Sequence, residues 1–335
     1  PMDLGARLGV NFEVSLGMKK FFFVISFFII IVLLFIIIKI DYVRRIDFAG
    51  KESVKKSFFY IKKNYLVKKY SSCFIDKKNQ KIAKQIIIAG HTYGYPDGEN
   101  LSTYPKFLNH LTETIVEKQD FIFLAGDIIK TGDMANKSNK IHFLQVKNEL
   151  SNFFNELYVA PGNHDVGLAL TNKTGRNEFL SVFNKNYQET VINDNLFIVL
   201  DSTFEPGNIS QDQLNFLKTK LKKVKDIKNI FIITHHVIWQ NYIGKKVTSN
   251  VNKDFFSKSN FGDVISLFKN LENKIKIFFV AGDIGVLKEK TIIFCERKNN
   301  LYFIATGMGN KRLDNYLKIL VSPEGEILLI KPIFF

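Results

Sequence analysis

The sequence predicts a layered α/β fold that follows one N-terminal transmembrane helix. Three observations support this prediction. An unbroken apolar run occupies residues 21–38, strand-like and helix-like segments alternate from residue 85 onward, and a polar residue directly follows almost every strand-like run. At 335 residues, the chain can hold one large domain or two small ones.

The apolar run "FFFVISFFIIIVLLFIII" carries no charge, and its length approaches the roughly 20 residues that a helix needs to cross a bilayer. No small-residue cleavage site follows it, so we expect an uncleaved anchor over residues 18–40. Met18-Lys19-Lys20, directly before the run, resembles a natural start. We therefore expect residues 1–17 to be an upstream tail.

The segment after the anchor is strongly basic. Residues 39–84 contain fourteen Lys or Arg against four Asp or Glu, a net charge of +10 out of the chain's +15. Paired lysines alternate with aromatic residues over 41–84, which suits anionic headgroups at a membrane surface. A solvated linker is the alternative, and the position of the charge beside the anchor argues against nucleic acid as a partner. The same excess favours a cytoplasmic position for the chain that follows the anchor.

The two cysteines, Cys73 and Cys295, offer no metal-binding or redox spacing. A chain of this size needs no disulfide to fold, so we expect both to be structural or incidental thiols.

Strand-like and helix-like segments alternate after residue 84. The expected strands are 85–90, 120–127, 156–162, 195–201, 229–236 and 276–283. The expected helices are 100–118, 138–155, 176–186, 210–225 and 259–273. The remaining chain is predicted to form antiparallel hairpins, the second of which turns at Pro323-Glu324-Gly325. This order predicts an α/β fold with an added antiparallel part.

Polar residues follow five of these strands where each strand ends. They are His91, Asp127, Asn163 with His164, His235 with His236, and Asp283. Ligands bind outside the carboxyl ends of strands in such sheets. Imidazole, amide and carboxylate groups are ligands for divalent metals, so the set predicts a metal site.

The motifs "VAPGNHDVG" (159–167), "LAGDIIKTGD" (124–133) and "IITHHVIW" (232–239) carry these residues. Taken in this order, they resemble the calcineurin-like metallophosphoesterases of the purple acid phosphatase and cyclic-nucleotide phosphodiesterase type. The resemblance spans residues 85–335, which we expect to be the metallophosphoesterase domain. It implies a layered α/β sandwich of mixed sheets flanked by helices.

The resemblance also implies roles for individual residues. Asp127 matches the carboxylate that bridges two metals, Asn163 an amide ligand of the second metal, and His164 the imidazole that stabilises or protonates the leaving oxygen. His235 matches a lone histidine ligand. His236 is expected to contact substrate.

Two motifs depart from the family pattern. His91 stands where the family has its first Asp, and Tyr93 where it has its first His. Asp283 replaces the first histidine of the last motif, and Gly285 replaces the second. The second metal therefore keeps a full set of ligands, whereas the first keeps His91, Asp127 and at most Tyr93. Tyr93 is a packing aromatic or a substrate contact on this interpretation. One or two divalent ions, chosen among Mn, Fe, Zn and Mg, are expected.

These observations predict a membrane-anchored metal-dependent phosphoesterase. It would hydrolyse a phosphate mono- or diester by metal-activated water. The anchor suggests a lipid- or envelope-glycan-linked substrate. The alternative is a catalytically inactive scaffold of the same fold that binds a partner at the membrane.

Overall fold

The computed structural model describes residues 31, 33–34, 56–77, 80–94, 101–130, 139–167, 173–203, 207–245, 247, 259–284, 292–309 and 313–335. The chain divides into two compact units, residues 1–61 and residues 62–335. The expected anchor at 18–40 lies almost wholly outside the described residues. Among the helices that are described, none combines the length and the apolar character that a bilayer crossing requires. The domain boundary expected at residue 85 stays a prediction.

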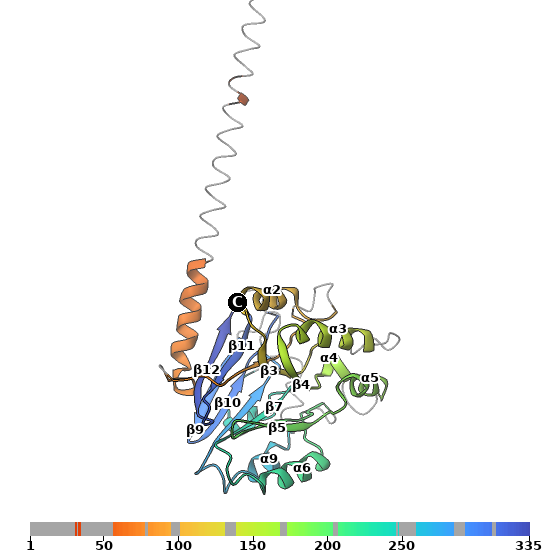
Figure 1. Cartoon of the computed structure of the whole chain (residues 1–335), viewed down its shortest axis with the longest axis vertical. Helices are drawn as coiled ribbons and strands as arrows, with labels where there is room; N and C mark the ends of the chain where they lie inside the picture. Colours follow the sequence, from red (N-terminus) through yellow and green to blue (C-terminus); the bar gives the residue numbers. More distant parts are fainter. Residues whose placement is uncertain are drawn as a thin grey trace, which may run out of the picture. The chain divides into compact units, whose positions relative to one another are not determined.

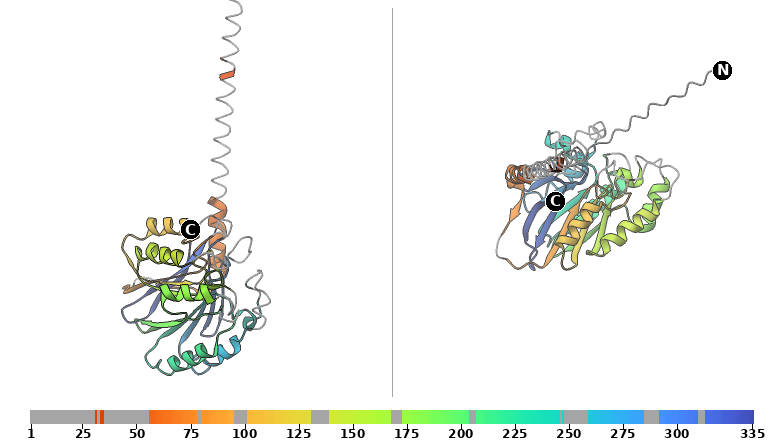
Figure 2. Two further views of the ribbon diagram at one scale, coloured as in Figure 1. Left: turned by 90° about the vertical axis from the view of Figure 1, so that its right-hand side faces the viewer. Right: turned by 90° about the horizontal axis from the view of Figure 1, so that it is seen from above.

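Two six-stranded sheets form the larger unit (Figures 1 and 2). The first has the order β1 (Ile75–Asp76), β12 (Ile327–Phe334), β11 (Asn315–Val321), β2 (Lys84–Ala89), β3 (Gln119–Ala125) and β4 (Phe154–Ala160). Strands β2, β3 and β4 are parallel, while β11, β12 and β1 add an antiparallel edge. The carboxyl ends of β2, β3 and β4 therefore meet at one edge of this sheet.

The second sheet has the order β5 (Gln188–Ile192), β6 (Asn195–Val199), β7 (Asn229–Thr234), β8 (Lys276–Ala281), β10 (Leu301–Ala305) and β9 (Phe294–Lys298). Its four central strands are parallel, and the two edge strands run antiparallel to them. The central strands are almost continuous runs of Ile, Phe, Val and Leu. That composition is typical of strands buried on both faces.

An aromatic row fills the space between the sheets. Phe123 of the first sheet stacks on Phe197 of the second, with ring centroids 4.8 Å apart. The row extends along both sheets through Tyr158, Phe231, Phe278 and Tyr302, at 4.5–4.9 Å between neighbouring rings. Large stacked rings bury much apolar area, so this row holds the two sheets together.

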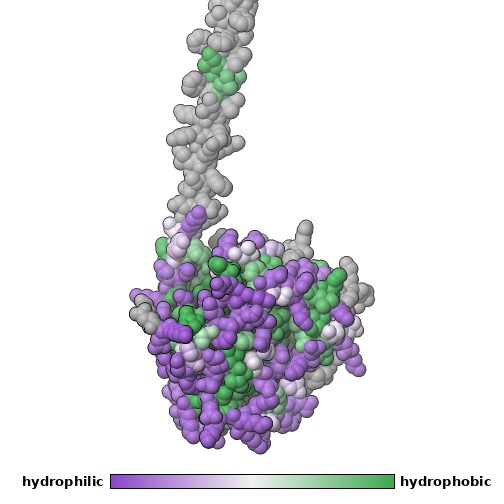
Figure 3. All heavy atoms as spheres, in the orientation of Figure 1, coloured by the Kyte–Doolittle hydropathy of each residue, from purple (hydrophilic) through white to green (hydrophobic). Residues whose placement is uncertain are grey.

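Helices cover the outer face of each sheet, which gives four layers. The helices against the first sheet are α2 (Pro105–Thr114), α3 (Lys140–Ser151) and α5 (Lys173–Phe183), which bury Phe107, Phe143 and Phe179. Those against the second are α6 (Gln211–Leu221) and α9 (Phe261–Ser266). The expected α/β fold with mixed sheets and flanking helices is thus confirmed. On the face shown in Figure 3 the surface is mostly hydrophilic, with apolar patches between the polar areas.

Smaller elements lie outside the predicted pattern. Strand β5 and the short helices α4 (Asn163–Val166) and α7 (Gln240–Ile243) were not expected. Residues 56–69 are helical, and the turn η1 (Ser71–Cys73) follows them. The basic segment therefore forms regular structure over much of its length.

The expectation of two free thiols is wrong. Cys73 and Cys295 form a disulfide, with their Cα atoms 6.2 Å apart. The bond joins η1 to the edge strand β9 across 222 residues of sequence. Spacing along the chain carried no sign of it, because only the folded topology brings these two positions together.

Candidate metal centre

The carboxyl ends of strands from both sheets deliver the polar residues to one place. His91 follows β2, Asp127 follows β3, and Asn163 follows β4 in the first sheet. His235 follows β7 and Asp283 follows β8 in the second sheet. One ligand-type atom each from His91, His235 and Asp283 lies within 4.8 Å of the others. The structure therefore brings together side chains that are up to 192 residues apart in the sequence.

Two of these residues have a left-handed backbone. The φ angles of His91 and Asp127 are 53° and 55°. Such angles are uncommon outside glycine, and they cluster at functional sites because the surrounding structure has to hold them. Gly126 precedes Asp127 with φ 76°, and a Cβ there would lie 2.6 Å from the His235 ring. Only glycine lets the Asp127 turn approach the histidine this closely.

The distances within the cluster suit a shared cation. His91 Nε2 lies 3.3 Å from Asp127 Oδ2 and 3.3 Å from Asp283 Oδ1. His235 Nε2 lies 3.4 Å from Asp127 Oδ1 and 2.9 Å from Asn163 Oδ1. Both aspartates and both histidines are buried. Two carboxylates at such short range inside a protein require compensating positive charge.

The orientation of His235 follows from its other nitrogen. His235 Nδ1 lies 3.1 Å from the carbonyl oxygen of Ala125, which can only accept a hydrogen bond. Nδ1 therefore carries the proton, and Nε2 presents a lone pair to the oxygens of Asp127 and Asn163. Burial lowers the pKa of His235 to about 4, so the ring stays neutral near pH 7. A backbone carbonyl that fixes the tautomer in this way is usual for metal-binding histidines.

Asp165 organises the turn that carries Asp127. Its carboxylate accepts hydrogen bonds from the backbone N–H groups of Asp127 at 2.9 Å and of Gly162 at 2.7 Å. It also accepts those of Ile128 at 2.8 Å and Ile129 at 3.0 Å. Burial and the nearby Asp127 raise the pKa of Asp165, while three of these N–H donors lower it. The sequence placed Asp165 in the same motif as Asn163 but could not show that it faces backbone.

The electrostatics of the two clustered carboxyls favour their charged forms. Burial acts to raise the pKa of Asp127, but the imidazoles of His235, His164 and His91 outweigh it and hold the pKa below its usual value. Burial likewise opposes ionisation of Asp283. The hydrogen bond from His91 and the nearby imidazoles nevertheless hold its pKa well below the usual range. Two anionic oxygens thus face the same small volume.

Tyr93 and His164 lie beside the cluster. The Tyr93 ring is 5.3 Å from that of His91 and 5.4 Å from that of His164. Tyr93 is almost fully buried, and burial together with three nearby aspartates raises the pKa of its phenol far above the usual value. The phenol therefore stays protonated, which makes Tyr93 a poor anionic ligand. Asn163 and His164 are partly exposed, so this side of the cluster is open to solvent.

His236 is fully buried beside Ser202. Its Nδ1 donates to the Ser202 carbonyl at 2.8 Å, and its backbone N–H donates to the Ser202 hydroxyl at 3.0 Å. Ser202 follows Asp201, a buried residue that receives a hydrogen bond from Arg176. Ser202 thus holds the turn after His235 through its bonds to His236, and the sequence analysis did not assign Ser202 a place in the site.

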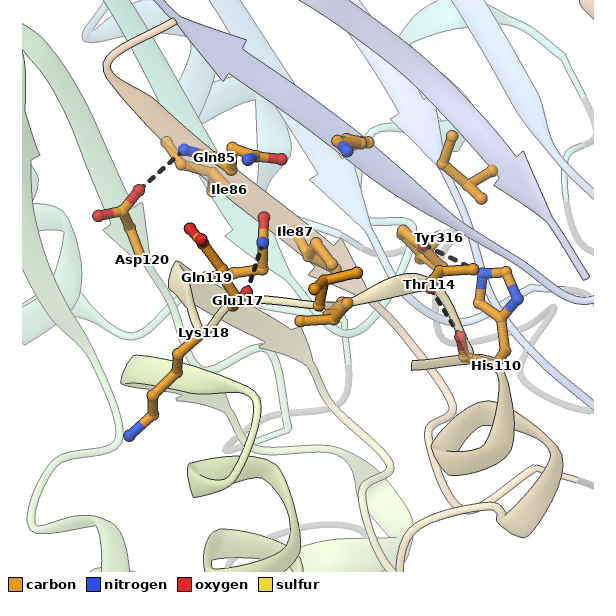
Figure 4. Close-up of a pocket in the computed structure, with 14 residues that line it drawn as sticks. Gln85, Ile86, Ile87, His110, Thr114, Glu117, Lys118, Gln119, Asp120 and Tyr316 are labelled. Carbon is orange, nitrogen blue, oxygen red and sulfur yellow. Dashed lines mark hydrogen bonds between the residues drawn. The ribbon is translucent and has the colours of Figure 1, made fainter. Parts of the chain in front are cut away.

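The cavity in Figure 4 lies at the other end of the first sheet. Its volume is about 600 Å³. Its walls include His110, Gln119 and Asp120, at or before the amino ends of the strands (Figure 4). Ligand sites in open α/β sheets lie at the carboxyl ends instead. We therefore assign the functional site to the smaller, buried cluster around Asp127.

The fold and this cluster are typical of metal-dependent phosphoester hydrolases. Residues 86–266, more than half of the chain, match the calcineurin-like phosphoesterase family, and the chain belongs to that family. No relative among curated proteins matches the chain.

Two phosphatases and a nucleotidase are among the solved structures that are similar to this chain. A dimetal phosphatase from Danio rerio is 14% identical with a TM-score of 0.51, and the match covers 76% of this chain and 99% of that one. A purple acid phosphatase from yellow lupin (Lupinus luteus) seeds is 12% identical with a TM-score of 0.49, covering 77% of this chain and 55% of that one. The NAD nucleotidase of Haemophilus influenzae is 15% identical with a TM-score of 0.42, covering 76% and 50%. This chain spans about half the length of the last two, and at these identities the likeness concerns the fold alone.

Proposed function

We propose that His91, Asp127, Asn163, His235 and Asp283 hold one divalent metal ion that serves phosphoester hydrolysis. The observation that carries this proposal is the arrangement around His235 Nε2. This lone-pair nitrogen lies 2.9 Å from the Asn163 amide oxygen and 3.4 Å from an Asp127 carboxylate oxygen. Three acceptors that face one another suit a cation among them, and nitrogen with oxygen donors suits Mn, Fe, Zn or Mg.

One ion fits this chain better than two. The resemblance to two-metal enzymes assigns the first ion a histidine at position 93 and another at position 285. Tyr93 is a buried, protonated phenol, and glycine at 285 has no side chain to offer; Gly285 itself lies outside the described residues. His91 and Asp283 instead approach each other and Asp127. The departures from the family pattern thus support a single centre.

A divalent ion bound there would polarise a phosphoryl oxygen and lower the pKa of a water toward neutrality. The chain's own groups supply the rest. His164 is partly exposed beside the cluster, and its backbone N–H donates to Asp127 Oδ1 at 2.9 Å, which fixes the turn. We assign to its imidazole the donation of a proton to the leaving oxygen, a role typically worth about 10²–10⁴-fold in rate.

We also propose that the enzyme is anchored in a membrane and acts on a lipid- or envelope-glycan-linked phosphoester. The apolar run at 21–38 and the basic segment after it support this proposal. Soluble nucleotides remain the competing substrate class. Hydrolysis by the full chain of a phospholipid monoester in mixed micelles, compared with a nucleoside monophosphate, separates the two.

Two opposing features bear on the side of the membrane that we propose for the domain. The lysine excess favours the cytoplasmic side, whereas the Cys73–Cys295 disulfide is typical of oxidising compartments. Long domains translocate largely regardless of charge, so we give the disulfide the greater weight. Alkylation of intact cells before any reduction tests this. If the disulfide is formed, neither cysteine should be alkylated. Alkylated cysteines would instead support a cytoplasmic domain.

The role of His164 can be measured with leaving groups of different acidity. The full chain with Mn²⁺ should hydrolyse phenyl phosphate and p-nitrophenyl phosphate, or the matching diesters, and a chelator should abolish turnover. The variant His164→Gln should lose more activity on the phenyl ester, because its poorer leaving group needs the proton more. Equal losses would remove His164 from this role. Absence of both metal and turnover would favour the inactive scaffold.

A further inference from the structure

A second cavity lies beside the disulfide and is lined by cations. Its volume is about 360 Å³, and three separate parts of the chain form its walls. Lys69 and Ser72 come from the segment around η1, Lys245 follows α7, and Arg297 belongs to β9. None of these residues belongs to the metal centre.

The positive charge of this cavity exceeds the negative charge. Glu296 is the carboxylate in its wall, and it pairs with Lys245 at 2.5 Å. Lys69 Nζ lies 5.0 Å from the centre of the Tyr70 ring, and the Arg297 guanidinium lies 5.2 Å from that of Tyr302. Within the part of the chain that the structure describes, neither Lys69 nor Arg297 pairs with a carboxylate. Two cations thus remain available to an anion.

The disulfide holds the cavity in shape. Cys73 follows Ser72 directly, and Cys295 lies two residues before Arg297, so the bond ties one wall to the other. The rings of Tyr70 and Phe294, which also line the cavity, lie with their centroids 6.0 Å apart. A binding site whose walls are fixed in advance loses less conformational entropy when its ligand binds.

We propose that this cavity binds a phosphate-bearing anion. The planar guanidinium of Arg297 carries several N–H donors. Its Nε donates a hydrogen bond to the Asn299 carbonyl at 2.9 Å, and its two terminal nitrogens can face the anion. Lys69 adds a charged donor and the Ser72 hydroxyl adds a neutral one. Lys245 pairs with Glu296, but its ammonium has three N–H donors and can contribute one of the others to the anion. This combination suits a phosphate oxyanion better than a carboxylate, because phosphate has more oxygens to share among several donors.

The phosphate has two sources with the same chemistry, a lipid headgroup or a soluble phosphoester. Lys69 ends the helical residues 56–69, whose sequence follows the apolar run. Basic pockets next to an anchor bind anionic headgroups, and each lysine near such a surface is worth about 1 kcal/mol. The two sources predict different behaviour of the same lysines.

Lysine acetylation followed by mass spectrometry measures occupancy on the full chain. Lys69 and Lys245 should react at least about threefold more slowly with sn-glycerol 1-phosphate present if the anion is soluble. If it is a headgroup, they should be protected in nanodiscs that contain phosphatidylglycerol but not in phosphatidylcholine alone. Lys222 and Lys223, exposed after α6, are the internal reference and should react unchanged. No protection in either arm, or equal protection of the reference lysines, overturns the proposal.

A charge reversal provides the second measurement. Arg297→Glu should abolish the protection of Lys69 and Lys245, since it places a carboxylate in the cavity wall. The matched control Lys223→Glu makes the same change of charge elsewhere and should leave the protection intact. Both positions are exposed, so both variants should fold. If both variants lose protection equally, general surface charge and not this cavity binds the anion.

Discussion

His91 Nε2 and Asp283 Oδ1 lie 3.3 Å apart, although they come from strands of different sheets. The family pattern has a carboxylate at the first position and an imidazole at the second, and this chain has the reverse. Because the two side chains contact each other, the exchange keeps one carboxylate and one imidazole in the same small volume. The paired departure therefore preserves the chemical composition of the centre.

We expect His91 and Asp283 to act on metal binding as a coupled pair. His91→Gln and Asp283→Asn should each weaken binding by at least about tenfold. The double variant should lose less than the product of the two single losses, because the residues share one ion and one contact. Titration against a chromophoric chelator gives the four affinities, with Asp212→Asn on the exposed face of α6 as control. Strictly independent losses would show that the residues do not share an ion.

Asp165→Asn should destabilise the fold and weaken metal binding together. The amide keeps one acceptor oxygen but turns an NH₂ group toward backbone N–H donors at Asp127 and Gly162. A buried donor left unpaired costs about 1–3 kcal/mol, so we expect the free energy of unfolding to fall by about that amount for each N–H donor that loses its acceptor. Urea unfolding followed by circular dichroism measures the loss. A wild-type midpoint with normal metal affinity would show that the Asp165 carboxylate does not hold the turn.

Replacing both cysteines with serine should lower the free energy of unfolding by about 2–4 kcal/mol. The bond closes a loop of 222 residues, and opening it gives the unfolded chain more conformational freedom. Dithiothreitol should bring the wild-type protein to the stability of the variant and leave the variant unchanged. Equal midpoints for oxidised and reduced wild-type protein would contradict a stabilising bond.

His110 should make the protein less stable as the pH falls. Burial and Lys106 lower the pKa of this histidine, and Glu113 opposes the shift. The ring stacks on Phe335 and lies within hydrogen-bonding distance of the Tyr316 hydroxyl. The unfolded chain takes up a proton near pH 6.5, before the folded one does, so stability present above that pH is lost below it.

Thermal unfolding between about pH 7.5 and 5.5 checks the role of His110. The wild-type midpoint should fall by about 1–3 °C more than that of His110→Phe. His142→Phe, in α3, should follow the wild type. An identical fall in all three proteins would exclude His110 as the source.

The central strands and the candidate site residues could be predicted from the sequence for one physical reason. Central parallel strands are continuous apolar runs, so the polar residue that ends each run marks the functional edge. Asp127, His235 and Asp283 were predicted in this way, and the structure brings them into one cluster. That these residues come from two different sheets was not predicted. The stacking of Phe123, Phe197 and Phe231 shows how the sheets pack, and their positions in the sequence do not indicate that stacking.

Other features depend on contacts that sequence patterns do not encode. Asp165 and Asp127 are both buried aspartates after glycine-containing turns, yet one binds backbone N–H groups and the other faces the cluster. Cys73 meets Cys295 only because η1 lies beside β9. Only the folded structure shows these contacts.

The stoichiometry of bound metal tests the central claim most directly. Full-length protein, dialysed against metal-free buffer and analysed by inductively coupled plasma mass spectrometry, should retain about one divalent ion per chain. Asp127→Asn should retain almost none, because it removes the charge of a buried carboxylate whose Oδ2 lies 3.3 Å from His91 Nε2 and whose Oδ1 lies 3.4 Å from His235 Nε2. Metal at background level in the wild-type protein, or the same content in the variant, would contradict the account.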